Sequence, residues 1–489
     1  MSRAIVIGAG IGGMASAIRM AAKGYEVHIY ESNTYPGGKL TEIKKEGFRF
    51  DAGPSLFTMP ELIEELRSIS GTNHDFNYKK LDEVCRYFYQ DGTVIQGWND
   101  AVRFSKEAAR ATGIDQRKVV RHLNKSRLIY ESTAHLFLEK SLHKIKSYLS
   151  FRTALSMFKL PLLNIFTTMN RANEKALAND KMIQLFNRYA TYNGSDPYRA
   201  PGILNIIPHL EFSKGAFFPE GGMHSITNFL YLVCLEQKVT FHFKEKVGQI
   251  IVENGRALGI QTVSAKVTAD LVICNMDVVP AYRKLMPVEK APGKILEQER
   301  SSSALIFYWG IKATFEELIL HNIFFTEDYK KEFEYLFSKN EIYSDPTVYI
   351  NISSKEKSDD AKEGMENWFV MINAPRNIGQ DWDSLILDAR KNIIEKLSRS
   401  LGRDIASLIV TEEVLDPRSI ESKTQSYQGS LYGTASNNKM AAFFRHPNFS
   451  RRIKGLYFCG GSVHPGGGIP LALSSAKIVD SMIKPALND

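Results

Sequence analysis

The first 31 residues carry the pattern that most constrains the fold, because it is typical of a dinucleotide-binding βαβ unit. An apolar stretch leads into glycines at the G-x-G-x-x-G positions, Gly8, Gly10 and Gly13, and a second apolar stretch ends in Glu31. Gly8 would allow a tight turn, Gly10 would let a pyrophosphate approach the backbone, and Gly13 would let the helix pack closely on the strand. The pattern therefore predicts a strand, a helix and a second strand around a bound nucleotide.

Polar groups at both ends of this unit suit a nucleotide. Phosphates would meet free N–H groups at the start of the helix, and Glu31 would accept a hydrogen bond from a ribose hydroxyl. A P-loop would need Lys and then Ser or Thr after the last glycine, where this chain has Met14 and Ala15. A signal-peptide core would not place its glycines at the phosphate-loop positions, so we expect no export signal.

The composition is that of a large enzyme. The chain has 489 residues, of which 44% are hydrophobic, and this length suggests about three domain-sized units. The sequence contains no run of about 18 uncharged apolar residues, so we expect no transmembrane helix. The 62 basic residues outnumber the 54 acidic ones and give a net charge of +8, which favours contact with anionic surfaces. Because no basic helix, zinc spacing or aromatic RNA-binding motif accompanies this charge, we do not expect nucleic acid as a partner.

The cysteines and histidines predict neither disulfides nor a metal site. Cys85, Cys234, Cys274 and Cys459 lie far apart and form no C-x-x-C pair, which is typical of buried thiols in a cytoplasmic protein. The sequence also has no H-E-x-x-H motif, no clustered Cys and His residues, and no carboxylate run with a suitable glycine.

The sequence after Glu31 favours FAD over NAD. Residues 32–40 read S-N-T-Y-P-G-G-K-L, and residues 48–60 read F-R-F-D-A-G-P-S-L-F-T-M-P. Around Gly38 the backbone could bend close to a ligand, and Lys39 supplies a cation that could lie beside phosphates. A NAD dehydrogenase would normally continue with another helix here. A plain turn is the alternative interpretation.

Two later segments return to the nucleotide-binding fold. Residues 217–274 predict a helix, a strand, a hairpin around Asn254-Gly255 and a further strand. Near the C-terminus, a strand that ends at Cys459 enters a glycine-rich loop, and Pro470 suits the first position of a new helix. The start of that helix would present N–H groups and a partial positive charge to a flavin ring that gains negative charge on reduction.

Together these residues resemble the bacterial carotenoid desaturases of the phytoene-desaturase type, which have the fold of the flavin-containing amine oxidases. The resemblance covers nearly the whole chain, and its C-terminal landmark is the most specific. In related enzymes that segment holds FAD beside a long apolar channel. The landmarks are residues 8–13, Glu31, 37–39 (G-G-K), 50–54 (F-D-A-G-P), 198–201 (Y-R-A-P), 218–223 (F-P-E-G-G-M), 427–430 (Y-Q-G-S) and 461–470 (G-S-V-H-P-G-G-G-I-P).

The resemblance implies an α/β + α fold. A Rossmann-like FAD-binding domain of the amine-oxidase and phytoene-desaturase type would carry an inserted mixed β-sheet substrate domain and a helical membrane-facing lid. The FAD-binding domain would comprise residues 1–75, 216–285 and 426–489, the helical membrane-associating region residues 76–215, and the substrate domain residues 286–425.

The resemblance also implies contacts for FAD. Val247 would contact the adenine through its backbone, and Gly461 and Ile469 would lie close to the flavin. Together with the motif residues, the predicted FAD site comprises Gly8, Gly10, Ile11, Gly12, Gly13, Glu31, Ser32, Gly38, Lys39, Val247, Gly460, Gly461 and Ile469.

Residues 140–173 suggest a contact with a membrane. This segment has no Asp or Glu but six Lys or Arg residues, and apolar side chains recur along it at roughly helical spacing. Such a segment can lie in a bilayer interface with its cations at the headgroups. An amphipathic helix that packs on the protein's own core is the alternative. With an apolar carotenoid substrate, we expect peripheral attachment to the inner, cytoplasmic face of the cell membrane.

The reaction that the resemblance implies is removal of two hydrogens from an allylic CH₂–CH₂ unit, with a hydride passing to the flavin. The continuation over residues 56–59 is similar to desaturases of already hydroxylated carotenoids. Phytoene and diapophytoene desaturases, carotenoid oxygenases, and isomerases or carriers remain alternatives within the family. A soluble amine oxidase is less compatible with the H-P-G-G-G-I-P segment. The sequence does not indicate an oligomeric state.

Two residues are candidates for catalysis. His464 lies in the loop predicted to face the flavin ring, where it could transfer a proton or, alternatively, stabilise the glycine-rich turn. Arg152 matches a position near the channel in related desaturases, but Thr153 replaces the acidic residue often found next to it. That replacement weakens the case for acid–base chemistry at Arg152.

Overall fold

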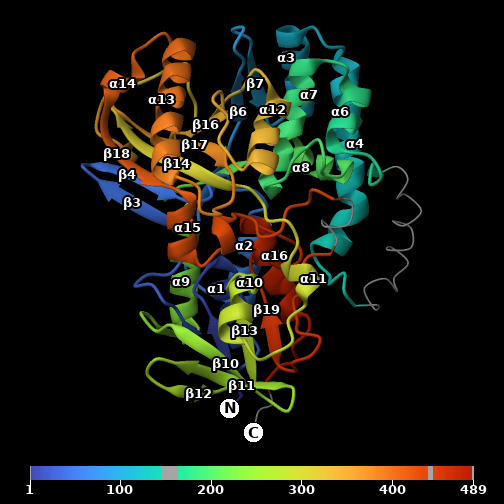
Figure 1. Ribbon diagram of the computed structural model, residues 1–489, viewed down its shortest axis with the longest axis vertical. Coiled ribbons are helices and arrows are strands. Elements are labelled where there is room, and N and C mark those ends of the chain that lie inside the picture. The colour runs from blue at the N-terminus through green and yellow to red at the C-terminus, as the bar shows by residue number, and fades with distance from the viewer. Residues whose placement is uncertain (1, 145–162, 439–443, 487–489) are drawn as a thin grey trace.

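A parallel five-stranded sheet forms the lower half of the molecule (Figure 1). The computed structural model describes residues 2–144, 163–438 and 444–486. The strands come from three distant parts of the chain, as the two predicted returns require. In order across the sheet they are β19 (Leu456–Phe458), β13 (Leu271–Cys274), β1 (Arg3–Ile7), β2 (Glu26–Tyr30) and β9 (Thr240–His242), all parallel.

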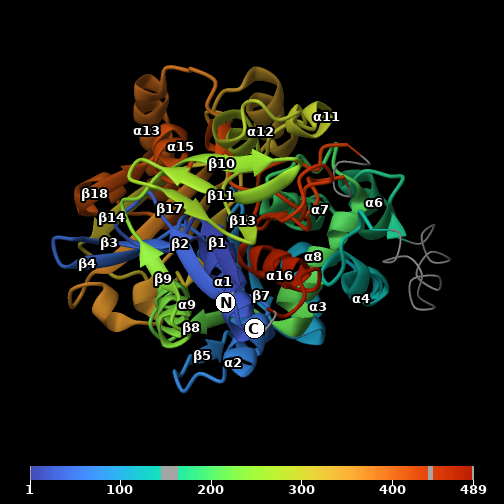
Figure 2. The same ribbon diagram turned by 90° about the horizontal axis from the view of Figure 1, so that it is seen from below.

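Both faces of this sheet are covered (Figure 2). Successive residues of β1 point to opposite faces, so Ala4 and Val6 pack against helices while Ile5 and Ile7 pack on the other side. Burial on both faces explains the uninterrupted apolar runs in the sequence. The helices are α1 (Ile11–Ala22), α2 (Glu61–Ser70), α9 (Ser225–Glu236) and α16 (Ile469–Asp480), and the other face carries β10 (Val247–Glu253), β11 (Arg256–Thr262) and β12 (Lys266–Thr268).

The turn between β10 and β11 confirms the predicted hairpin. Asn254 and Gly255 have φ values of 49° and 71°, and Glu253 pairs with Arg256 in an antiparallel ladder. Positive φ at both central positions gives the turn a twist that matches the flanking strands.

A seven-stranded mixed sheet forms the upper left of Figure 1 and confirms that the chain carries a mixed β-sheet beside the nucleotide-binding fold. Only β15 and β6 pair in parallel; the other neighbours are antiparallel. Two of its strands come from the region 76–215, so this sheet joins both predicted insertions. In order the strands are β18 (Ile409–Leu415), β14 (Ser303–Ile311), β17 (Glu366–Ala374), β16 (Val348–Asn351), β15 (His321–Phe324), β6 (Glu83–Phe88) and β7 (Val94–Trp98).

Helices occupy the upper right of Figure 1. Four of them begin at a side chain that accepts a backbone N–H bond, namely Asp100, Asp115, Thr168 and Asn179. Such caps satisfy donors that the helix itself cannot pair. The helical segments are α3 (Ala101–Thr112), α4 (Gln116–Phe137), α6 (Met169–Leu177), α7 (Asp180–Asn187), η3 (Arg188–Asn193), η4 (Gly202–Ile206), α8 (Ile207–His209) and η5 (Leu210–Lys214).

Shorter elements complete the described chain, and α13 packs its buried side chains on one face of the seven-stranded sheet. They are β3 (Thr41–Lys45), β4 (Phe48–Ala52), β5 (Tyr78–Lys80), β8 (Phe217–Pro219), α10 (Val278–Pro280), η6 (Ala281–Leu285), α11 (Gly293–Leu296), α12 (Tyr329–Glu334), η7 (Tyr335–Lys339), η8 (Ser353–Lys355), η9 (Ser358–Asp360), α13 (Trp382–Leu401), α14 (Ile405–Leu408), α15 (Pro417–Thr424) and η10 (Tyr427–Gly429).

The segment predicted to face a membrane is described only in part. Residues 145–162 lie outside the described residues, so the membrane-facing lid stays a prediction. Of the helices that the structure describes, none has the length and hydrophobicity needed to cross a bilayer.

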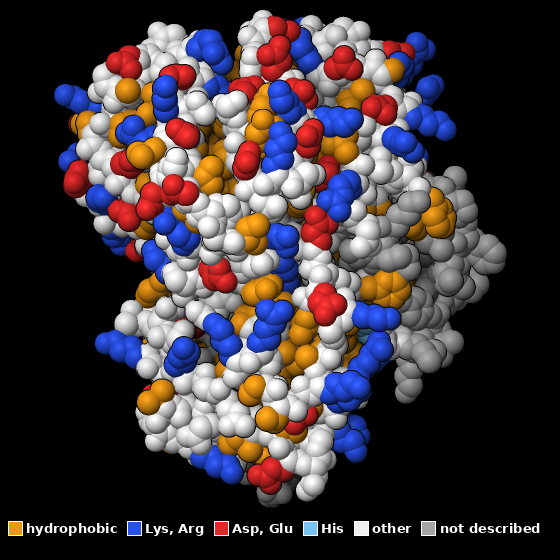
Figure 3. Space-filling model, viewed as in Figure 1, with side chains coloured by type: hydrophobic (Ala, Val, Ile, Leu, Met, Phe, Trp, Pro, Cys, Tyr) orange, Lys and Arg blue, Asp and Glu red, His pale blue; other side chains and the backbone are white. Residues whose placement is uncertain are grey.

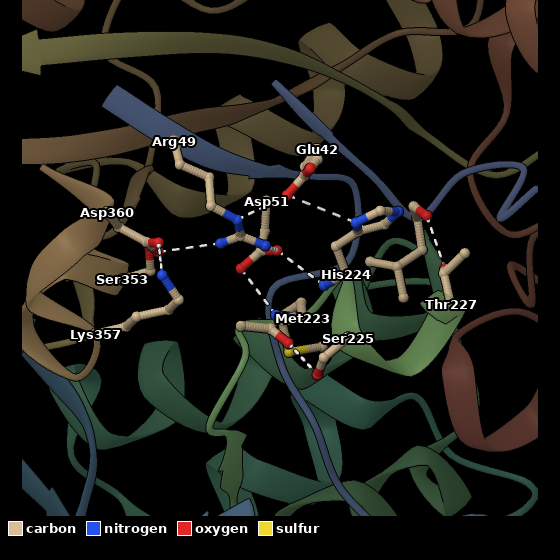
Figure 4. A network of polar contacts seen from close by, with 12 residues as sticks. Glu42, Arg49, Asp51, Met223, His224, Ser225, Thr227, Ser353, Lys357 and Asp360 are labelled. Carbon is tan, nitrogen blue, oxygen red and sulfur yellow. Dashed lines mark hydrogen bonds and ion pairs between the residues drawn. The ribbon is translucent and has the colours of Figure 1, made fainter. Parts of the chain in front are cut away.

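A buried ionic network connects β3 and β4 with η9, which lies in the chain between β16 and β17 of the seven-stranded sheet (Figure 4). The Arg49 guanidinium donates to Asp51 at 2.7 Å, to Asp360 at 3.1 Å and to Glu42 at 2.8 Å. Asp360 at the end of η9 is fully buried, and Asp51 is 4% exposed. One guanidinium thus serves carboxylates from three segments of the chain.

The same network fixes the chain that leads into α9. The Asp51 carboxylate accepts the backbone N–H groups of Met223 and His224 at 2.9 and 2.8 Å. These two residues directly precede α9, which covers α1 in the nucleotide-binding half. Asp51 therefore couples the landmark at residues 50–54 to the landmark at residues 218–223.

Candidate functional site

One cavity of about 1450 Å³ lies between the nucleotide-binding half, which contains the five-stranded sheet, and the half that contains the seven-stranded sheet and the helical segments. It exceeds the roughly 300–1,000 Å³ of ordinary small-ligand pockets. The segments that follow β1, β2, β13 and β19 all line it, and this carboxyl edge of a parallel sheet is where nucleotides bind. The cavity therefore has room for a dinucleotide and a second, elongated ligand.

The glycines of the first turn allow close packing at the start of α1. Gly8 has a φ of 95°, and a Cβ on Gly13 would lie 2.1 Å from the Gly8 carbonyl oxygen. Gly13 thus lets the helix pack on the strand, as predicted, but it does not line the cavity. Gly8, Gly10, Ile11 and Gly12 do line it.

Asn275, which follows β13, fills the remaining space around this turn. A Cβ on Gly10 would lie 2.6 Å from Asn275 Oδ1, and a Cβ on Gly12 would lie 2.9 Å from Asn275 Nδ2. The Asn275 amide also donates to the Cys459 sulfur at 3.5 Å. Sequence reasoning did not select Asn275. Its position directly after the predicted buried strand that ends at Cys274 could have indicated a residue at the nucleotide-binding edge of the sheet.

The start of α1 is open for an anion. No side chain caps this helix, and its first turn contains no acidic residue. The first N–H groups of a helix have no partner within the helix and attract negative charge. Gly38 lies close by, because a Cβ on it would be 3.3 Å from the Gly10 Cα.

Glu31 directly follows β2 beside this turn and is 6% exposed. Its Oε2 accepts the Ala9 N–H at 2.8 Å, and its Oε1 accepts the Asn33 N–H at 2.8 Å. These bonds fix the carboxylate at the cavity wall, where Ser32 and Val247 also lie. The three predicted residues therefore all line the cavity.

Lys39 lines the cavity, but its ammonium is held by the C-terminal half of the chain. Lys39 Nζ donates to the carbonyl oxygens of Leu431 at 2.8 Å and Ser430 at 3.2 Å. Burial lowers the pKa of Lys39 to about 8, against the opposing charge of the nearby Asp277. Asp277 itself forms an ion pair with Arg300. Lys39 therefore links the segment after β2 to residues 430–431. Sequence reasoning did not predict this link.

The C-terminal glycine loop brings a second helix start to the cavity. Gly460, Gly461 and Ile469 line it, and the Gly460 N–H donates to Ser475 Oγ at 2.7 Å. α16 begins at Ile469, one residue before Pro470, and has no side-chain cap and no acidic residue in its first turn. The predicted helix at this site is thereby confirmed, with its free N–H groups at the cavity.

His464 lies behind this loop, because it is not among the cavity-lining residues and its side chain is fully buried. Its Nε2 lies 3.0 Å from the Lys140 carbonyl oxygen, and its ring packs edge-on against Phe137. Burial lowers the pKa of His464 to about 3. This placement favours stabilisation of the loop over proton transfer to a ligand. Arg152 lies outside the described residues.

The upper part of the cavity is predominantly apolar. It lies between the seven-stranded sheet and the helical segments, and its walls would align a long apolar molecule and exclude water. The apolar lining includes Leu56, Met59, Leu204, Ile206, Ile207, Leu210, Ile306, Ile323, Phe369, Met371 and Leu431.

A polar cluster interrupts this apolar wall, and sequence reasoning missed it. The Arg188 guanidinium lies 3.4 Å from the Glu211 carboxylate, which also accepts the Tyr189 hydroxyl at 2.6 Å. Arg188, Glu211, His321 and Tyr329 come from four separate elements, η3, η5, β15 and α12, and all line the cavity. No local motif marks them, because their proximity arises only from the tertiary fold.

Among the described residues, no group of three or more His, Cys, Asp or Glu side chains is arranged to hold a metal ion. Cys85, Cys234, Cys274 and Cys459 are buried free thiols, which confirms the prediction of buried thiols.

The residues present fit FAD. Gly8, Gly10, Gly12 and Gly38 form a cradle without side chains on the cavity wall, two uncapped helix starts face the cavity, and a fixed carboxylate lies at its edge. Twelve of the thirteen predicted FAD-site residues line this one cavity, and Gly13 alone packs behind it. As the resemblance to related enzymes implies, Gly461 and Ile469 would hold the flavin, and Glu31 and Val247 would hold the adenosine.

Comparison with known proteins agrees with this assignment. A family model described as flavin containing amine oxidoreductase matches residues 11–309. The chain is 51% identical over 484 residues to a 1-hydroxycarotenoid 3,4-desaturase of Flavobacterium sp. (strain P99-3), with 99% of each chain covered. It is 31% identical over 491 residues to a 4,4'-diapolycopene oxygenase of Methylomonas sp, with 98% of each chain covered.

Solved structures share the fold at low sequence identity. An oxidoreductase from Methanosarcina mazei matches with a TM-score of 0.63 and 16% identity over 98% of this chain and 100% of its own. Putrescine oxidase bound to putrescine matches with a TM-score of 0.64 and 12% identity over 98% of both chains. The chain thus belongs to the flavin-containing amine oxidoreductase family, and it is an FAD-dependent oxidoreductase.

Proposed function

We propose that this enzyme is a carotenoid desaturase, which removes hydrogens from adjacent carbons of a hydroxylated acyclic or monocyclic carotenoid. The observation that carries the proposal is the single cavity that joins the cofactor cradle to a long apolar wall. The relative that is 51% identical acts on a 1-hydroxycarotenoid, by its name, and supports the choice of substrate.

The protein's part in this reaction is to position the substrate and to exclude water from it. FAD, when bound, supplies the hydride acceptor. The apolar side chains between the sheet and the helices hold the polyene so that one carbon–carbon bond faces the cofactor. A dry wall also protects a polyene cation from attack by water while its proton leaves. His464 acts here as a positioning residue, since it ties the C-terminal glycine loop to the Lys140 carbonyl.

An anaerobic single turnover tests the reaction. We expect the flavin absorbance to bleach as a product appears that absorbs at longer wavelength and has lost two hydrogens, because each added double bond extends the conjugated system. A product of unchanged mass with oxidised flavin would make the protein an isomerase. Product that forms only in air and gains oxygen would favour the oxygenase alternative, which the relatives at 31–32% identity keep open.

We propose in addition that the enzyme binds the cytoplasmic face of the cell membrane through residues 140–173, which would give an apolar substrate a route into the cavity. The segment carries six cations and no acid. Phe166, near its end, is 74% exposed. Lys and Arg side chains also crowd the lower right edge of the molecule in Figure 3, which suits an anionic surface.

Sedimentation with vesicles tests the membrane contact. We expect binding to phosphatidylglycerol vesicles at low salt that weakens as salt screens an attraction of about 1 kcal/mol per basic residue. A triple variant with Lys146, Arg152 and Lys159 replaced by Gln should bind less, whereas Lys290→Gln, outside the segment, should not. Equal binding to phosphatidylcholine and phosphatidylglycerol vesicles at low salt would contradict the proposal.

A further inference from the structure

Three buried side chains on the apolar wall each have a polar atom without a partner. These atoms are His321 Nε2, Tyr329 OH and Arg188 Nε, for which no hydrogen-bond partner exists among the described residues. The side chains are 2%, 5% and 6% exposed, and all three line the cavity. Buried polar groups in proteins are nearly always paired, so three unpaired groups on one wall indicate a ligand that pairs them.

The tautomer of His321 can be assigned from its neighbours. Its Nδ1 lies 2.7 Å from the Tyr349 hydroxyl and 3.2 Å from Asn351 Nδ2. The Asn351 amide nitrogen also donates to the Leu320 carbonyl oxygen at 3.2 Å, which fixes it as a donor. Nδ1 therefore accepts, and the ring proton resides on Nε2 as a donor without a partner.

The charges of the cluster are balanced internally. The Arg188 guanidinium is paired with Glu211 and lies 4.5 Å from the centre of the Tyr189 ring. Burial, with the nearby charge of Arg188, lowers the pKa of His321 to about 3, so the ring is neutral. A charged ligand would upset this balance. A neutral oxygen that accepts hydrogen bonds, as in a hydroxyl group, would not.

A chain of contacts links the cluster to the segment that carries Lys39 and the cofactor cradle. The Tyr349 hydroxyl, which contacts His321, also bonds to Ser55 Oγ at 2.8 Å. Ser55 lies two residues after Gly53, which packs so closely on the Lys39 carbonyl that a Cβ would lie 1.8 Å from its oxygen. In the proposed substrate, a carotenoid end group carries a hydroxyl on carbon 1, and the enzyme would form a double bond between carbons 3 and 4. The hydroxyl oxygen is then only a few bonds from the reacting carbons. A binding group for that oxygen must lie close to the cofactor.

We propose that His321, Tyr329 and Arg188 bind the hydroxyl oxygen of the substrate and so set which carbon–carbon bond faces the cofactor. The inference rests on the proposed function and adds the group by which the enzyme selects its substrate. A site built to hydrogen-bond a hydroxyl rejects the analogue that lacks it, because its buried polar atoms then stay unpaired.

Two variants test this site with a pair of substrates. One substrate is a carotenoid with a 1-hydroxy end group, and the other is the parent carotenoid without the hydroxyl. We expect Tyr329→Phe to weaken binding and turnover of the hydroxylated substrate by roughly tenfold and His321→Phe by roughly 10–100-fold, with little change for the parent. His321→Gln, which keeps an N–H donor, should restore part of the loss. Binding is read from quenching of flavin fluorescence, and turnover from kcat and KM.

Tyr308→Phe is the matched control. The Tyr308 hydroxyl is also buried and without a partner among the described residues, but Tyr308 does not line the cavity. This variant should leave both substrates unaffected. Equal losses on the two substrates, or no loss with Tyr329→Phe and His321→Phe, would overturn the proposal. If the wild-type enzyme desaturates neither substrate, the proposed function fails. The ratio of the dissociation constants for the hydroxylated and the parent carotenoid then still decides whether the enzyme recognises the hydroxyl.

Discussion

Replacing Gly10 by valine is expected to weaken FAD binding by roughly 100-fold or more while the chain still folds. Gly10 precedes α1 with φ −70° and ψ 170°, a region open to any residue, so the substitution causes no backbone strain. The added Cβ would lie 2.6 Å from Asn275 Oδ1, so Asn275 must shift at the cavity wall and disturb the phosphate site beside the free N–H groups of the helix. Loss of two charge-assisted hydrogen bonds to phosphate, at about 1.5–3 kcal/mol each, weakens binding roughly 100-fold or more.

The measurement is the ratio of flavin to protein absorbance after gel filtration, together with a titration of the apoprotein with FAD. Gly293→Val is a matched control, because a Cβ at that position would meet its nearest atom, Glu297 Oε1, only at 3.7 Å. This control should retain its flavin. Wild-type FAD affinity in the Gly10→Val protein would show that the phosphates bind elsewhere.

The nucleotide-binding half could be predicted because its signals are local. Three glycines, a terminal acid and an Asn-Gly hairpin each act within a few residues, and the sequence order of strands and helices follows from them. Even there, Lys39 differs from expectation, since its partners are carbonyl groups of Ser430 and Leu431. Those partners are almost 400 residues away in sequence, and no local pattern reveals such a contact.

The substrate half was less predictable because it is assembled from distant segments. β6 pairs in parallel with β15, more than 200 residues later, so a strand from the first insertion completes the sheet of the second. That pairing also positions β15, which carries His321 of the polar cluster with Arg188 and Tyr329. Likewise, the loop position of His464 suggested contact with the flavin, but the direction of its side chain is set by packing against Phe137.

Arg49→Met is expected to lower the free energy of unfolding by about 3–5 kcal/mol, the cost of leaving buried charges uncompensated. Asp51 and Asp360 are 4% and 0% exposed, and Arg49 lies between them (Figure 4). Asp360 keeps Lys357 at 2.8 Å, so most of the loss should fall on Asp51. Since Asp51 also holds the chain that enters α9, we expect weaker FAD retention as a secondary effect. Chemical denaturation measures the first, and flavin release on warming the second.

The pH dependence separates loss of charge compensation from loss of packing. Burial raises the pKa of Glu42, but hydrogen bonds from Lys44 and Arg49 outweigh this effect and lower it from 4.5 to about 2. A carboxylate with a lowered pKa stabilises the fold above pH 4.5, and this contribution is lost as the pH falls toward 2. The difference between wild type and Arg49→Met should therefore narrow over this window. Lys44→Met is the control: Lys44 pairs with Glu42 at 2.8 Å but is 69% exposed, so its loss should cost at most about 1 kcal/mol. A difference that stays constant with pH would assign the effect of Arg49 to packing alone.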